Sequence, residues 1–162
     1  MNQRKNQQGF TLIELMLSVL VLAIVLAIAL PSYRDFADRG KASEGYALAY
    51  GLVDDMLEFE QFAGALPTTL GDINKGFPAD HAGRYVTSVA LNADSTISAT
   101  FGGPDAGNLA GTILTLVPFV NNAGDYQFVC HPIIPANLNV VVAAPIQPTT
   151  VPSNLLPQNC RT

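Results

Sequence analysis

The chain has 162 residues, of which 49% are hydrophobic, and a formal net charge of −5 at pH 7. This length allows one soluble domain of ordinary size together with an additional segment. The acidic balance excludes the strongly basic surface on which most nucleic-acid-binding proteins depend, so direct nucleic-acid binding is not indicated.

The N-terminus combines a short polar stretch with a long apolar one. Residues 1–9 are polar and include Arg4 and Lys5, and residues 10–31 read FTLIELMLSVLVLAIVLAIALP. As a helix that rises about 1.5 Å per residue, residues 10–31 would be roughly 33 Å long, enough to cross a hydrocarbon core of about 30 Å. The two cations favour a cytoplasmic N-terminus, although further cations after the apolar run weaken that rule.

Two ordinary interpretations compete for this segment. A secretory signal peptide has a shorter apolar core of about 7–15 residues and a small-x-small cleavage site, whereas this run ends in Pro31-Ser32-Tyr33. A plain signal anchor explains the length but leaves Glu14 unexplained. A charged side chain at a bilayer centre costs about 2.5–3.5 kcal/mol on insertion scales, so Glu14 is a candidate functional residue.

The heptapeptide Gly9-Phe10-Thr11-Leu12-Ile13-Glu14-Leu15 resembles the processing site of type IV pilin precursors of the short-leader class. The resemblance implies that a prepilin peptidase cuts after Gly9 and that the new terminus, Phe10, is N-methylated. It also implies that Glu14 pairs with the Phe10 amine of a neighbouring subunit. A buried amine and a buried carboxylate are each costly alone and much less so as a pair, so this pairing would set the register of a filament.

The helical pattern continues beyond the apolar run. Pro31 removes a helical hydrogen bond and can kink or end a helix; the resemblance implies a kink inside one long helix. Residues 32–63 are amphipathic, although three glycines interrupt them. The apolar stripe that we expect to pack on a sheet consists of Leu48, Leu52, Met56, Phe59 and Ala63.

The middle of the chain predicts strands separated by turn residues. The four predicted strands are Arg84–Leu91, Ser95–Phe101, Thr112–Val117 and Asp125–Cys130. We expect an antiparallel meander on the helical stripe, and therefore an α+β fold whose long N-terminal helix spans a membrane in its first half.

The C-terminal tail, residues 131–162, carries six prolines. Cys130 directly precedes the tail, and Cys160 lies near its end. The prolines exclude a central strand, although residues 138–143 are compatible with a short edge strand. Cys130 and Cys160 suit a single disulfide in an oxidising compartment, and two free thiols are the alternative. The resemblance implies the disulfide, which would bound a loop of about 31 residues.

The sequence contains no recognisable catalytic or metal-binding arrangement. His81 and His131 are single histidines in loops, and the acidic residues of the 54–60 segment are spread along a helix. Neither a nucleophile with its base nor zinc-ligand spacing is present. We therefore expect no cofactor and no metal, and a chain that is the substrate of a peptidase and a methyltransferase rather than an enzyme.

The predicted organisation is a cleaved leader over 1–9, a transmembrane and assembly helix over 10–31, and a globular domain over 32–162. That domain continues the helix and holds the sheet over 84–130 and the disulfide loop over 130–160. The expected function is the structural subunit of a type IV pilus, with adhesion, twitching motility and DNA uptake as implied roles. The alternatives are a minor pilin, a type II secretion pseudopilin, or a membrane-tethered binding module.

The resemblance also implies the partners and the location. The partners are other copies of the chain in a helical homopolymer, the prepilin peptidase and methyltransferase, the pilus assembly machinery, and the inner membrane before assembly. The precursor would be single-pass with its globular domain in the periplasm, and the assembled pilus would be extracellular.

Overall fold

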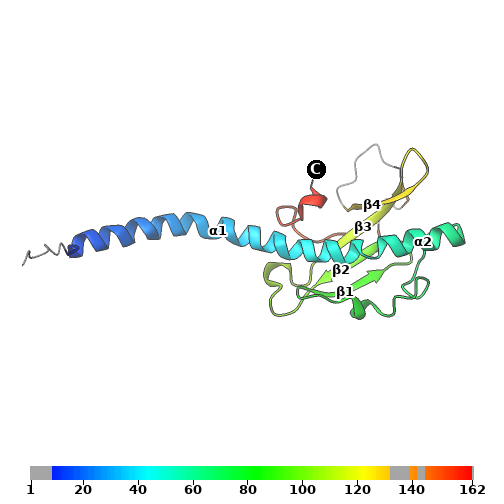
Figure 1. The fold of residues 1–162 in the computed structure, drawn as a ribbon, viewed down its shortest axis with the longest axis horizontal. Coiled ribbons are helices and arrows are strands. Elements are labelled where there is room, and N and C mark those ends of the chain that lie inside the picture. The colour runs from blue at the N-terminus through cyan, green and yellow to red at the C-terminus, as the bar shows by residue number, and fades with distance from the viewer. Residues whose placement is uncertain (1–8, 132–138, 142–144, 162) are drawn as a thin grey trace, which may run out of the picture. The chain divides into compact units, whose positions relative to one another are not determined.

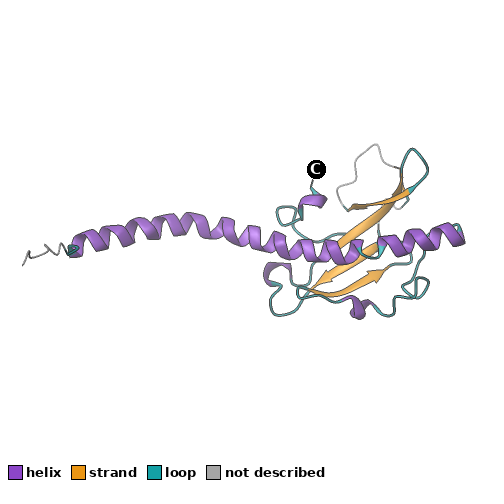
Figure 2. Ribbon diagram, in the orientation of Figure 1, coloured by secondary structure: helices purple, strands orange, loops and turns teal. Residues whose placement is uncertain are grey.

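A computed structural model describes residues 9–131, 139–141 and 145–161 of the chain. They belong to two compact units, one that ends at Asp35 and one that begins at Phe36. Figure 1 labels the main elements and Figure 2 distinguishes helices from strands. In chain order the elements are α1 (Leu12–Tyr50), α2 (Val53–Ala63), η1 (Pro78–His81), β1 (Val86–Leu91), β2 (Ile97–Phe101), η2 (Gly107–Leu109), β3 (Ile113–Val120), β4 (Tyr126–Cys130), β5 (Asn139–Val140) and η3 (Gln158–Cys160).

The N-terminal unit is helical from Leu12 onwards. Its leucine, isoleucine, alanine and valine side chains surround the helix on all sides, and they are exposed within this unit. A helix that is apolar all round requires an apolar environment outside the chain itself. Pro31 lies inside α1, which continues past it to Tyr50, so the prediction of one long helix is confirmed; the kink remains a prediction.

In the globular unit the helix is interrupted once. α1 ends at Tyr50, Gly51 and Leu52 form a turn, and α2 begins at Val53. α2 ends at Ala63, where the predicted helical range 32–63 also ends. The next residue, Gly64, adopts a left-handed conformation, with φ of 75°, and its N–H donates to the Glu60 carbonyl. Glycine is favoured at such a C-terminal cap because it has no Cβ to clash.

The four predicted strands form the expected antiparallel meander, in the order β1-β2-β3-β4. The main difference is β3, which extends through Pro118 to Val120. Proline is tolerated there because β2 pairs with β3 only as far as Leu116, so the missing N–H would face a position beyond β2. The Pro118 carbonyl instead accepts a hydrogen bond from the Val141 N–H, 3.0 Å away.

The predicted edge strand over 138–143 is described only in part. Its two assigned residues, Asn139 and Val140, form β5, which pairs antiparallel with Val120 and Phe119 of β3. Residues 138, 142 and 143 lie outside the described part of the chain.

The core lies between the helices and the sheet, as Figure 1 shows for α2 and the cyan part of α1. The predicted stripe is correct for Leu52 and Met56, which are buried, and for Leu48 and Phe59, which pack against the core. It is wrong for Ala63, which is exposed because it lies in the last turn of α2. Further towards the N-terminus, the buried helix residues are Asp38, Ala42, Gly45 and Ala49.

The C-terminal segment covers part of the sheet. The Ile146 N–H donates to the Asp94 carboxylate at 2.8 Å, and the Thr115 hydroxyl donates to the Gln147 carbonyl. The Thr150 N–H also bonds to the Ile113 carbonyl at 2.8 Å, at the end of β3 that β4 does not reach. These bonds attach the segment to the sheet without a regular strand, which the prolines of this segment disfavour.

Candidate functional site

The predicted cleavage point lies in an exposed, non-helical stretch. Gly9, Phe10 and Thr11 precede α1, and the Phe10 side chain is 81% exposed. A Cβ built on Gly9 would meet nothing within 4 Å, and Gly9 is absent from the glycines with positive φ. The structure of the chain therefore does not require glycine at position 9.

Thr11 caps the N-terminus of α1. Its hydroxyl oxygen accepts a hydrogen bond from the Glu14 N–H at 3.3 Å, which satisfies one of the free donors at the start of the helix. The Thr-x-x-Glu spacing is that of a capping box, a signal that our interpretation of the sequence overlooked. Glu14 also lies in the first turn, where the helix dipole favours a negative charge.

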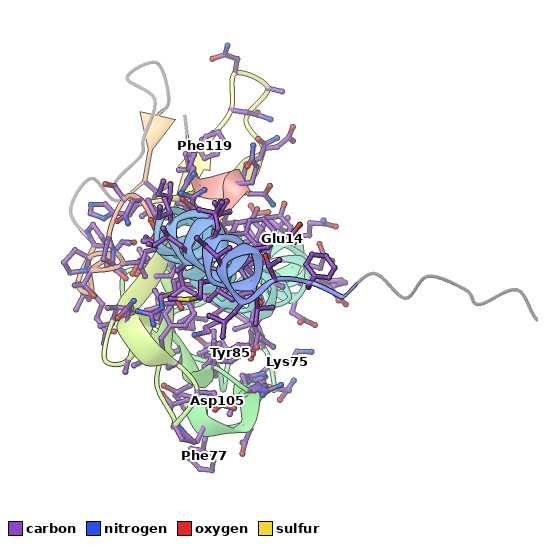
Figure 3. The ribbon with its side chains drawn as sticks, turned by 90° about the vertical axis from the view of Figure 1, so that its left-hand side faces the viewer. Glu14, Lys75, Phe77, Tyr85, Asp105 and Phe119 are labelled. Carbon is purple, nitrogen blue, oxygen red and sulfur yellow. A yellow bond between two sulfur atoms is a disulfide. The ribbon has the colours of Figure 1, made fainter. Side chains whose placement is uncertain are left out.

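The Glu14 carboxylate is isolated on an apolar surface. From Leu12 to Ser32 it is the only ionisable side chain, and no basic group of the described chain lies within salt-bridge distance of it. Figure 3 labels it on the N-terminal part of α1. Its surroundings are exposed leucine, isoleucine, methionine and valine side chains.

The described residues include one helix that is long and apolar enough to cross a membrane. The most apolar stretch of 18 residues has a mean hydropathy of 2.9, and no part of that stretch is buried within the chain. This helix surface and Glu14 together make the candidate assembly site.

A partly buried ionic cluster holds a loop of the globular unit to α1. The Lys41 ammonium and the Asn108 amide donate to the two oxygens of the Asp38 carboxylate, at 2.8 and 2.9 Å. The hydrogen bond from Lys41 lowers the pKa of Asp38, with burial opposing and Asn108 adding to the effect. The sequence does not reveal this cluster, because Asn108 lies 70 positions from Asp38.

The two cysteines form the predicted disulfide. Cys130 at the end of β4 and Cys160 in η3 have their Cα atoms 5.2 Å apart, and both are buried. Neither histidine joins a catalytic group: the His81 ring nitrogen lies 2.7 Å from the Lys75 carbonyl, and burial lowers the pKa of His131. Within the described residues no three potential metal ligands cluster.

Comparison with known families agrees with this architecture. Residues 39–161 match the family described as pilin (bacterial filament), and residues 4–30 match the prokaryotic N-terminal methylation motif. The chain belongs to the type IV pilins. Pilins are structural subunits of filaments and not enzymes, and membership implies that this pilin polymerises and that a prepilin peptidase processes it.

Curated relatives are also pilins or fimbrial proteins. The pilin is 31% identical to the type IV major pilin protein PilE1 of Neisseria gonorrhoeae over 160 residues, which cover 96% of this chain and 87% of that protein. It is 29% identical to a fimbrial protein of Neisseria meningitidis serogroup B over 161 residues, 96% and 94% of the two chains. The fimbrial protein EcpC of Eikenella corrodens is 39% identical over 90 residues, and the match spans 56% of this chain and 58% of that protein.

Proposed function

We propose that this pilin is the major subunit of a type IV pilus and that it assembles through α1 after cleavage between Gly9 and Phe10. The observation that carries the proposal is Glu14, a lone carboxylate in an apolar helix that has no partner in the described chain. A plain membrane anchor has no use for this charge, whereas a filament can pair it between subunits.

Cleavage supplies the missing partner. A cut after Gly9 creates an amine at Phe10, directly before the Thr11 cap of α1. That positive charge would lie at the positive end of the helix dipole, where it is unfavourable, and so requires an anion. The Glu14 carboxylate of a neighbouring subunit meets this need in surroundings of low dielectric constant.

The identity of residue 9 supports the cleavage step. Because the fold leaves open space around Gly9, the requirement for glycine would come from the peptidase that binds it. We expect Gly9→Val to leave the leader attached without altering the globular domain. Mass spectrometry of the wild-type protein should find a chain that begins with N-methyl-phenylalanine; an intact leader, or a terminus near Ser32, would refute the cleavage site.

The exposed apolar surface of α1 would be covered in two successive environments, the membrane and the filament. Before assembly it would span the inner membrane, with the globular domain on the periplasmic side. After extraction it would pack against other copies of α1 in the filament, and the assembled pilus would be extracellular. For the cell we propose adhesion and twitching motility; DNA uptake by the pilus need not involve direct binding to this acidic chain.

The decisive experiment replaces the assembly carboxylate. We expect Glu14→Val to be inserted, cleaved and folded, because insertion becomes easier and the globular core contains no part of residues 10–31. Filament assembly should be severely reduced. The measurement compares processed protein in membranes with filaments sheared from cells that lack the wild-type subunit. A normal filament yield would refute the role of Glu14.

Abundance distinguishes a major subunit from the alternatives. The sheared filaments should consist predominantly of this chain, whereas a minor pilin or a pseudopilin would be a trace component. A membrane-tethered binding module would keep its activity when an unrelated anchor replaces residues 1–31, and a pilin would not.

A further inference from the structure

A basic groove lies on the globular unit between α1 and the C-terminal segment. Its volume is about 260 Å³, and its charged lining residues are Arg39 of α1 and Arg161 at the end of the tail, without a carboxylate. Figure 1 shows the red C-terminal segment beside α1. Ser43 and Gln158 add polar side chains, and Phe36 and Leu156 add apolar ones.

The two arginines converge on one backbone oxygen. Arg39 Nε donates to the Asn154 carbonyl at 2.9 Å, and Arg161 Nη2 donates to the same oxygen. The two donor nitrogens are therefore at most about 6 Å apart, since each bond is about 3 Å long. Arg161 Nε is buried and has no hydrogen-bond partner among the described residues. An anion beside the two guanidinium groups would reduce the repulsion between their charges.

The other cations of the globular unit already have carboxylate partners. Their pairs are Lys41 with Asp38 at 2.8 Å, Lys75 with Asp55 at 2.9 Å and Arg84 with Asp105 at 3.0 Å. Within the described residues, Arg39 and Arg161 thus differ from every other cation of this unit. In a chain of net charge −5 this local positive charge is a specific feature.

Two lining residues of the groove come soon after the apolar segment in the sequence. Phe36 lies five residues beyond Pro31, and Arg39 lies eight residues beyond it in the same helix, α1. Long arginine side chains that follow a membrane span can extend their charge towards the lipid head groups. The Phe36 ring is 72% exposed, and aromatic side chains are enriched at this depth of a membrane.

We propose that the groove binds the phosphate of an anionic membrane phospholipid while the pilin waits in the membrane, an inference that rests on the proposed membrane-inserted stage. Guanidinium groups bind phosphate oxygens through paired, charge-assisted hydrogen bonds, and two guanidinium groups line this groove. A groove of about 260 Å³ suits a head group rather than a whole lipid. The contact would hold the globular domain at the membrane surface until the subunit is extracted.

The test uses the full-length chain in micelles of a neutral detergent and native mass spectrometry with added lipid. Phosphatidylglycerol should bind more tightly than phosphatidylcholine, which carries the same phosphate without net charge. Arg39→Gln and Arg161→Gln should each lower the affinity for phosphatidylglycerol at least about tenfold, because each loses charge-assisted bonds. Arg39→Lys should retain part of the binding. Arg84→Gln is the matched control, since Arg84 is an exposed arginine that pairs with Asp105, and it should change nothing.

The variants must keep their thermal transition and a closed disulfide, so that a loss of binding reports on the groove. Equal binding of the two lipids, or unchanged binding by Arg39→Gln and Arg161→Gln, would overturn the proposal. Displacement of phosphatidylglycerol by equimolar inorganic phosphate would also overturn it in favour of a free-phosphate site. Unchanged lipid binding with a loss of filaments would instead assign the arginines to a carboxylate of a second copy.

Carbonate extraction of cell membranes tests insertion separately. Protein that is released by carbonate but binds phosphatidylglycerol in micelles would contradict only the proposed membrane stage. Protein that resists extraction but binds both lipids equally would contradict only the role of the groove.

Discussion

Two glycines of α1 differ in what the sheet allows at their positions. A Cβ added to Gly45 would lie 2.3 Å from Cζ and 2.8 Å from Cε1 of Phe101, well inside normal contact distances. A Cβ added to Gly40 would meet nothing within 4 Å. Gly45→Ala therefore tests whether the helix approaches the sheet this closely, and Gly40→Ala is its control.

The expected magnitudes follow from the two environments. Alanine in place of glycine stabilises a helix by roughly 0.5–1 kcal/mol, and this gain is common to both variants. Only Gly45→Ala adds overpacking, which typically costs about 1–3 kcal/mol, because the Phe101 ring is 1% exposed and has little room to move. The free energy of unfolding of Gly45→Ala should thus be about 1–3 kcal/mol below that of Gly40→Ala.

The assay is urea or thermal unfolding of the full-length chain in detergent micelles with the disulfide intact, followed by circular dichroism and tyrosine fluorescence. Phe101→Leu supplies a second check, because a smaller side chain on β2 should reduce the penalty of Gly45→Ala in a double-mutant cycle. A Gly45→Ala variant as stable as Gly40→Ala, with no coupling to Phe101, would refute the close approach.

Three other predictions address the remaining features. Glu14→Asp should yield filaments at a level between wild type and Glu14→Val, since the charge remains but its reach is shorter; sheared-filament yield measures this, and a wild-type yield contradicts it. Cys160→Ser should lower the free energy of unfolding by roughly 3.5 kcal/mol, the loop-entropy value for the bond to Cys130; full thiol labelling of the denatured, unreduced wild type would show that the bond is absent. Asp38→Asn should cost about 1–3 kcal/mol at neutral pH. Because the pKa of Asp38 is lowered in the folded state, its contribution to stability is complete above the unfolded pKa of about 3.9 and is lost as pH falls through the folded pKa. The free energies of unfolding of the wild type and Asp38→Asn, measured in urea, should therefore converge in acid. A difference that does not depend on pH would mean that the ion pair with Lys41 contributes nothing.

Local chemistry made much of this protein predictable from its sequence. An apolar run long enough to span a membrane, with a single carboxylate in it, is a pattern in consecutive residues, and so is the glycine that ends α2. The four strands were found because side-chain alternation and turn residues act over a few positions, and their order followed from short connections.

Tertiary structure decided the features that depend on distant residues. The predicted stripe ended one turn too far, at Ala63, and omitted the small residues Ala42, Gly45 and Ala49, which are buried because the sheet approaches the helix backbone there. The pairing of Asp38 with Lys41 and Asn108, and the convergence of Arg39 and Arg161 on Asn154, join residues that no local pattern connects. Hydrophobic periodicity specifies which face of an element is buried, but close packing against a particular neighbour determines which side chains fit and which charges meet.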